Sequence, residues 1–167
     1  MTVTRMGSAQ QEVSLDATTS FDEVYEAHYP RLVRVLRLDG LSLADSEDLA
    51  QEAFSRAVGR WGLIARGANP AGYIYTTAFR LRRRRRAPSD AAGSVAPAEP
   101  DPSLEVVALL EVERLLAMLS ATQRRCLAMY YLADLSTEDI GRILGVSPST
   151  VRVHLHRARG RLTGKEL

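Results

Sequence analysis

The sequence predicts an all-α protein made of two small helical domains joined by a flexible linker. Apolar residues recur at helical spacing through most of the chain, and no segment alternates apolar and polar residues for long enough to form a strand. Alanine, proline, serine and acidic residues dominate 87–103, which has no helical period and is typical of a linker. We therefore expect a disordered tail over 1–19, a first domain over 20–86, the linker over 87–103 and a second domain over 104–167.

Capping signals place the first two helices of the first domain. Ser20 and Ser42 each stand three residues before an acidic residue, which is the spacing of a capping box, and each opens a helical pattern. We expect helices over 20–38 and 43–61. Pro30 lies inside the first helix and should kink it, because proline removes an internal hydrogen bond and crowds the preceding turn.

A third helix, rich in arginine, is predicted over 69–86. Its apolar face carries Ile74, Thr77, Ala78 and Leu81, and the other face carries the following side chains: Tyr73, Thr76, Arg80, Arg83 and Arg84. An aromatic ring followed by arginines can stack an unpaired base while the cations pair with phosphates. Taken alone, the segment also fits an RNA-binding patch, a targeting patch or a solvated tail.

The second domain opens with a helical pattern over 104–119. Ser120 with Gln123 caps the next helix, which we expect to run through Leu132. Ser136 with Asp139 has the same reciprocal spacing and begins a shorter helix, which Gly145 ends.

The last helix has the division of side chains that a DNA-reading helix needs. Ser147 and Pro148 supply a cap and a first-turn proline. The predicted buried stripe consists of Val151, Leu155, Ala158 and Leu162, and the opposite side of Ser149, Arg152, Val153, His156 and Gly160, with Arg157 flanking. From 150 to 161 there are four arginines, two histidines and no acid. An ordinary pair of amphipathic helices with a solvent-exposed face would carry acidic as well as basic residues there. This pattern therefore favours a helix-turn-helix that binds a major groove.

Composition excludes several other classes of protein. The formal net charge is only +2, but acidic residues concentrate in the first third and arginines after it, which favours a nucleic-acid partner on one surface and a different partner on another. Cys126 is the only cysteine, so neither an internal disulfide nor a cysteine-based metal site can form. The chain has no signal peptide and no apolar run near 18 residues, and we expect it to be cytoplasmic.

An enzyme is not expected. His154 and His156 diverge by about 200° on a helix and cannot share a metal, and the sequence shows no nucleophile with a base and no glycine-rich phosphate loop. We therefore predict no catalysis, no metal and no cofactor.

Three segments in this order resemble the bacterial sigma factors of the small extracytoplasmic-function type in the sigma-70 family. LADSEDLAQEAFSRAV (43–58) and NPAGYIYTTAFRLRRRRR (69–86) are similar to parts of the family's region two, and LSTEDIGRILGVSPSTVRVHLHRARGRL (135–162) is similar to its region four. The resemblance covers about residues 20–164. It implies a factor that binds core RNA polymerase and directs promoter-specific transcription initiation, while polymerase supplies the catalysis.

The resemblance also implies which residues make each contact. Contacts with the minus-35 duplex would come from Ser149, Thr150, Arg152, Val153, His156 and Arg157. Contacts with the opened minus-10 element would come from Asn69, Tyr73, Thr76, Arg80, Arg83 and Arg84, with a flipped base held near 62–69. Core polymerase would bind Asp45, Asp48, Gln51 and Glu52. An anti-sigma factor is a further partner that the resemblance allows.

Some positions depart from the family pattern, and one alternative function stays open. Tyr73 stands where tryptophan is usual and Arg80 where asparagine is usual, so the base preference of this helix cannot be carried over. Gly141 replaces a common alanine, which should weaken its helix by up to about 1 kcal/mol. The alternative is a stand-alone transcription regulator that binds duplex DNA without polymerase, although it leaves the acidic and arginine-rich helices unexplained.

Overall fold

The computed structural model describes residues 19–85 and 114–164, and every regular element within these ranges is a helix. The helices are α1 (Phe21–Leu38), α2 (Leu43–Val58), α3 (Trp61–Ile64), α4 (Pro70–Arg85), α6 (Ala121–Tyr131), α7 (Thr137–Leu144) and α8 (Pro148–Leu162). The predicted linker and most of the predicted tail lie outside the described residues, as does most of the helix expected over 104–119, of which 114–117 are helical.

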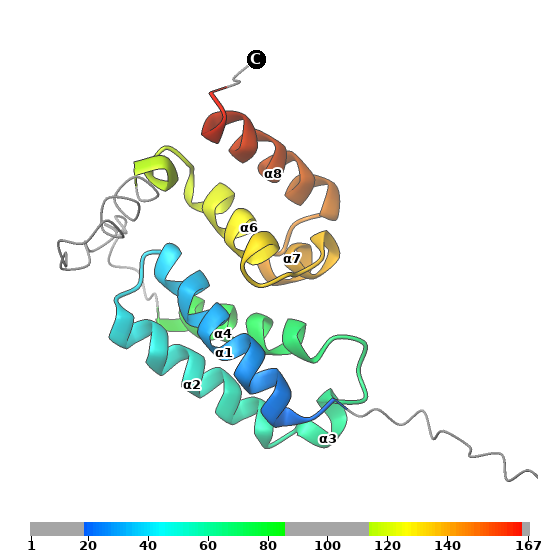
Figure 1. The fold of residues 1–167 in the computed structure, drawn as a ribbon. Coiled ribbons are helices and arrows are strands. Elements are labelled where there is room, and N and C mark those ends of the chain that lie inside the picture. The colour runs from blue at the N-terminus through cyan, green and yellow to red at the C-terminus, as the bar shows by residue number, and fades with distance from the viewer. Residues whose placement is uncertain (1–18, 86–113, 165–167) are drawn as a thin grey trace, which may run out of the picture.

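In the first domain α2 packs against both α1 and α4 (Figure 1). The core of this domain contains the fully buried side chains of Leu32, Leu36, Leu49, Ile74 and Tyr75. α1 runs through Pro30 as one continuous helix. The burial of Tyr75 and of Phe79 shows that the apolar face of α4 is broader than the sequence pattern predicted.

The expected extent of the second helix was wrong. α2 ends at Val58 rather than at Trp61, because the backbone of Arg60 leaves the helical region (φ −128°, ψ 14°) and α3 begins separately. The Trp61 indole N–H donates to the carbonyl of Thr19 (3.2 Å), and its ring lies 5.1 Å from that of Phe21. These contacts hold Trp61 against the start of α1. The helical pattern of α2 alone does not predict them.

The capping predictions are confirmed only in part. Ser120 and Gln123 form the full reciprocal box, with bonds of 2.9 and 3.3 Å. At Ser42 and Ser136 only the serine half forms, because the aspartate at the third position accepts the serine's own hydroxyl proton (2.6 and 2.7 Å) instead of reaching back to the cap backbone. Aspartate is one methylene shorter than glutamate, which explains the difference.

The second domain is built from α6, α7 and α8 around Cys126, Met129, Ile140, Val151 and Leu155, all of them buried. Between α7 and α8 the chain turns at Gly145, whose φ of +72° is a left-handed conformation that favours glycine. The predicted helix-turn-helix is therefore confirmed, with a separate helix on each side of the turn.

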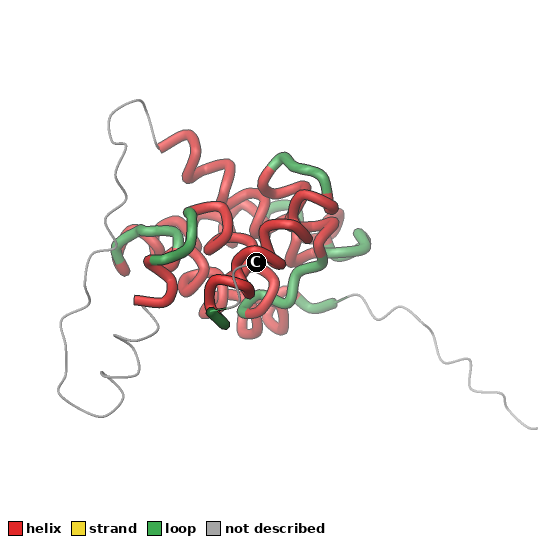
Figure 2. The backbone as a smooth tube through the Cα atoms, turned by 90° about the horizontal axis from the view of Figure 1, so that it is seen from above, coloured by secondary structure: helices red, strands yellow, loops and turns green. Residues whose placement is uncertain are grey.

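The two domains pack against each other. α6 lies against α1 and α7 against α4, and the buried apolar side chains of both domains form one continuous cluster. Figure 1 shows α6, α7 and α8 stacked on one side of the α1, α2 and α4 group, and Figure 2 shows from above that the regular elements of the described residues are all helices.

Candidate nucleic-acid interface

One face of α8 is available to a partner along most of its length. Val151, Leu155 and Ala158 are buried against the domain, as the sequence predicted, and Leu162 is half-buried. On the opposite side the following predicted residues are exposed: Ser149, Arg152, Val153, His156 and Arg157. Thr150 is half-buried and shares a contact with the hydroxyl of Ser147 (2.8 Å). The helix thus offers short polar groups, two arginines and an apolar side chain on a single face.

Arg152 is held only loosely within the protein. Its guanidinium donates to the hydroxyl of Thr137 (3.3 Å) and lies 3.7 Å from the carboxylate of Glu138, and both charged side chains are 60% exposed. A surface pair of this kind contributes about 0–1 kcal/mol, so Arg152 can leave it for a stronger acceptor at little cost.

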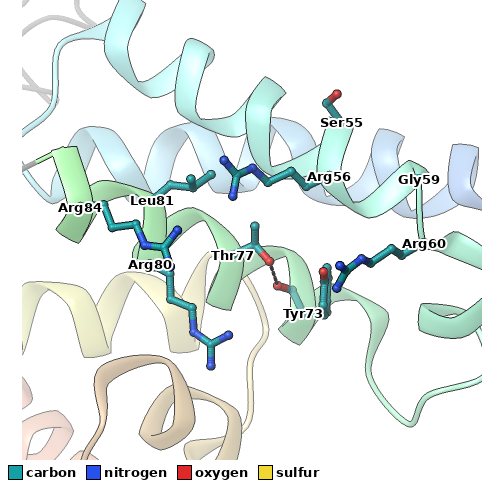
Figure 3. A pocket seen from close by; sticks show the side chains of 9 residues that line it. All are labelled: Ser55, Arg56, Gly59, Arg60, Tyr73, Thr77, Arg80, Leu81 and Arg84. Atoms are coloured by element: carbon teal, nitrogen blue, oxygen red, sulfur yellow. Dashed lines mark hydrogen bonds between the residues drawn. The ribbon is translucent and has the colours of Figure 1, made fainter.

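A second cationic surface is a groove between the end of α2 and the outer face of α4. The groove has a volume of about 480 Å³, and Figure 3 shows Arg56 and Arg60 approaching it from the side opposite Arg80 and Arg84. Tyr73 lies at one end, where its carbonyl accepts a hydrogen bond from Thr77 (2.9 Å). This arrangement places an aromatic ring among cations, which suits a single nucleic-acid strand.

The sequence reasoning missed the contribution of α2 to this groove. Arg56 lies in the last turn of α2 and Arg60 two residues after the helix ends, so only the path of the chain after Val58 brings both to the groove. Among the predicted residues, Tyr73, Arg80 and Arg84 line the groove. Arg83 is exposed but does not line it, and Thr76 binds the carbonyl of Gly72 (2.7 Å) on the neighbouring side.

Asn69 has two partners in the structure. Its side-chain oxygen accepts from the backbone N–H of Gly72 (2.8 Å), which caps the start of α4, and its amide N–H donates to the carboxylate of Asp139 on α7 (2.6 Å). Asn69 therefore lies where the two domains meet, beside a groove of about 550 Å³ that includes Tyr73 and Arg80 on one side and Arg142 on the other.

A third surface is the acidic face of α2. Asp45, Asp48 and Gln51 are exposed. Glu52, predicted to belong with them, instead pairs with Arg56 (2.7 Å) and Arg85 (2.6 Å) and so lies at the boundary between the acidic face and the arginines of α4. Three of the four predicted residues are therefore exposed on α2. Among the described residues, the side-chain contact that these three make is that of Asp45 with its capping serine.

The described residues contain no group of three or more potential metal ligands, and none of the described helices is long and apolar enough to cross a membrane. Burial raises the pKa of the Cys126 thiol to about 11, so the thiol stays protonated near neutral pH and has a packing role.

Comparisons with known proteins match both domains. The family model described as Sigma-70 region 2 matches residues 24–87, and the one described as Sigma-70, region 4 matches residues 109–162. The ECF RNA polymerase sigma factor ShbA of Streptomyces griseus is 34% identical over 144 residues, which are 77% of this chain and 75% of that protein. The ECF RNA polymerase sigma factor SigM of Mycobacterium tuberculosis is 28% identical over 148 residues, or 86% and 75% of the two chains.

Solved structures show the same fold at lower identity. The sigma factor RpoE of Bartonella quintana, in a co-crystal with the anti-sigma factor NepR, has a TM-score of 0.61 and 21% identity, and the match covers 86% of this chain and 94% of that one. CnrH in complex with the cytosolic domain of CnrY has a TM-score of 0.58 and 19% identity, covering 86% and 85%.

Proposed function

Since the chain belongs to the extracytoplasmic-function sigma factors of the sigma-70 family, which bind core RNA polymerase and direct promoter-specific initiation, we propose that three of its surfaces divide this work. The exposed face of α8 binds the minus-35 duplex, the α2–α4 groove binds the opened minus-10 strand, and the acidic face of α2 binds core polymerase. The family consists of non-enzymatic initiation factors, and this chain has no catalytic role in our proposal. Core polymerase works on the chromosome, so we place the chain in the cytoplasm.

The observation that carries the proposal is that the cationic and the acidic side chains lie on separate exposed surfaces. On α8 the arginines and short polar groups face outward while the apolar stripe is buried. Such a face can enter a major groove and place Arg152 and Val153 against base edges, with arginine reading guanine and valine contacting a thymine methyl.

The α2–α4 groove suits a strand that has lost its partner. Tyr73 offers a ring for stacking, and Arg80 and Arg84 face Arg56 and Arg60 across the groove (Figure 3). Each phosphate neutralised there on single-stranded DNA should add about 0.7 to the slope of log affinity against log salt. A single strand fits this site better than a duplex because stacking on Tyr73 needs an unpaired base.

We assign the binding of core polymerase to the acidic face of α2 because the fold of the protein does not account for these side chains. Asp48 and Gln51 are exposed, and no contact of either side chain within the described residues explains their presence. A cationic segment of polymerase would be attracted to this face and repelled by the arginine groove, which fixes the orientation of the complex.

Two further points concern partners. The RpoE structure that shares this fold contains the anti-sigma factor NepR, and we propose that this chain also has an anti-sigma partner. A stand-alone regulator is not favoured, because such a protein has no use for the acidic face of α2.

The assignment of α2 is tested with Asp48→Arg. We expect the variant to lose at least about tenfold in affinity for purified core polymerase, as reversal of a charge within an interface costs several kcal/mol, while its circular dichroism spectrum and melting temperature are unchanged. Glu26→Arg, the same change of charge at an exposed position of α1, is the control and should bind normally. Unchanged co-purification of Asp48→Arg with core polymerase would show that α2 is not the docking surface.

The function as a whole is tested by run-off transcription with sigma-free core polymerase on a library of upstream DNA fragments. We expect the full chain to select start sites that core polymerase alone does not use. A chain that confers no selection on any fragment would contradict the proposal.

A further inference from the structure

Glu52 of α2 stands between two of the proposed surfaces of the first domain. Asp48, Glu52 and Arg56 follow one another at intervals of four residues, so they form a row along one side of the helix. Asp48 belongs to the proposed docking face for core polymerase, and Arg56 lines the proposed strand groove. Neighbours in the row are about 6 Å apart along the helix axis, which is within the range of about 8 Å over which charges interact at physiological salt.

Both oxygens of the Glu52 carboxylate are engaged by arginines. Oε1 accepts from the guanidinium of Arg56 (2.7 Å), one turn along α2, and Oε2 accepts from Arg85 at the end of α4 (2.6 Å). The three side chains are between 32% and 50% exposed, so phosphates and other charged groups can reach them. Glu52 therefore holds two cations of the arginine-rich side without removing them from solvent.

Arg56 differs in this respect from the other arginines of the strand groove. Arg60, Arg80 and Arg84 also line the groove, and none of them pairs with a carboxylate within the described residues. A strand phosphate that binds Arg56 must take it from Glu52, whereas the other three arginines are available at once. Exposed ion pairs contribute little stability, so the exchange is easy. Each arginine that stays on Glu52, however, is one phosphate fewer neutralised.

A cation at the docking face competes for the same carboxylate. The cationic segment of core polymerase that binds near Asp48 lies one helical turn from Glu52 and attracts it as well. This attraction weakens the hold of Glu52 on Arg56 and Arg85. The reverse effect has the same size, because phosphates that take the arginines leave the carboxylate unpaired and able to attract polymerase.

We propose that Glu52 is a positioning residue that couples the two surfaces: it exchanges Arg56 and Arg85 for a cation of core polymerase, and the released arginines bind phosphates of the opened strand. The inference rests on the proposed function for the assignment of both surfaces. It goes beyond a direct contact of Glu52 with polymerase, because it predicts that removal of the two arginines strengthens polymerase binding.

The first test measures binding of the full chain to a fluorescein-labelled single-stranded DNA 12-mer of random sequence, by anisotropy at several salt concentrations without polymerase. Glu52→Gln keeps the shape of the side chain and removes its charge. We expect this variant to bind about twofold to fivefold more tightly than the parent, the factor that one exposed ion pair contributes. The slope of log affinity against log salt should steepen by about 0.7 for each arginine released.

Glu47→Gln is the matched control, because Glu47 is exposed on the same helix and pairs with no arginine within the described residues. It should keep the slope of the parent. An equal slope for Glu52→Gln and the parent would overturn the exchange. Arg80→Ala in the Glu52→Gln background separates that failure from failure of the proposed function: if Arg80→Ala does not weaken binding of the 12-mer, the α2–α4 groove is not the strand site.

The second test measures affinity for purified sigma-free core polymerase without DNA, as a double-mutant cycle. Arg56→Gln/Arg85→Gln leaves Glu52 unpaired, and we expect it to bind polymerase about twofold to fivefold more tightly than the parent. In the Glu52→Gln background the same two substitutions should have no effect, because the carboxylate through which they act is absent.

Two results of this cycle would overturn the coupling: no gain in the parent background, or an equal gain in both backgrounds. Normal polymerase binding by Asp48→Arg would instead show that the docking face itself is misassigned. Each variant is first checked for the circular dichroism spectrum and melting temperature of the parent, so that a change in affinity is not a change in fold.

Discussion

Arg152 is the residue of α8 whose role can be resolved most sharply. Its contacts with Thr137 and Glu138 are long and exposed, so the side chain is available to a base edge. We expect Arg152→Ala to lower the discrimination at one base pair of the minus-35 element by about 1–3 kcal/mol, as the loss of a bidentate contact would. Competition binding of the polymerase complex to promoters with single substitutions in that element measures this directly.

Arg159→Ala is the matched control for this prediction. Arg159 lies on the same helix, but it donates to the hydroxyl of Tyr131 (2.8 Å) and packs on the ring of that tyrosine. Its removal should leave the ranking of the promoters as it was. An equal loss on every promoter with Arg152→Ala would identify Arg152 as a phosphate contact instead.

At the scale of elements, the turn between α7 and α8 depends on Gly141. Helix propensity alone predicts that Gly141→Ala stabilises α7 by up to about 1 kcal/mol. In the structure, however, a Cβ atom at this position would lie 2.7 Å from the backbone carbonyl oxygen of Val146. Because that oxygen belongs to the turn itself, it cannot move without shifting α8. We therefore expect Gly141→Ala to lower the melting temperature or leave it unchanged.

Gly62→Ala provides the comparison. Gly62 lies within α3, and a Cβ atom there meets nothing within 4 Å. This substitution should stabilise the chain by about 0.4–1 kcal/mol through the entropy of the unfolded state. Thermal unfolding of both variants tests these two predictions. A melting temperature of Gly141→Ala above that of the parent would show that the turn relaxes freely.

At the scale of the whole molecule, stability depends on pH through His28, a half-buried residue of α1. Its ring lies 6.1 Å from that of the buried Tyr75, and its Nδ1 is buried without a hydrogen-bond partner among the described residues. Burial lowers the pKa of His28 below its usual 6.5, Arg31 lowers it further, and Asp134 in the turn after α6 opposes the shift.

The lowered pKa sets the direction of the pH dependence. Below pH 6.5 the unfolded chain takes up a proton at this histidine while the folded chain does not, so stability falls as the pH falls from 6.5 toward the pKa of folded His28. We expect His28→Gln to lose less stability than the parent between about pH 7.5 and 5.5 in urea titrations. His156→Gln, at an exposed histidine of α8, should follow the parent, and equal slopes for His28→Gln and the parent would contradict the assignment.

The sequence by itself determined most of the helices and the buried stripe of α8. Capping serines, Gly145 and the apolar stripe of α8 are local signals, and each acts within a few residues, so the bounds of α1, α7 and α8 followed from them. The family followed for a related reason, since the order of three motifs along a chain is a property of sequence. Where the prediction of an element failed, at the end of α2, a contact between Trp61 and Thr19 competed with the local pattern.

Only the tertiary structure decided which charges meet. Asp39 and Arg125 are 86 residues apart, and Asn69 and Asp139 are 70 apart; no spacing in the sequence marks either pair. The groove lined by Arg56 and Arg80 likewise needs α2 and α4 to pack before its cations converge. Such contacts depend on how apolar faces are buried against one another, because that packing sets the distances over which the charges act.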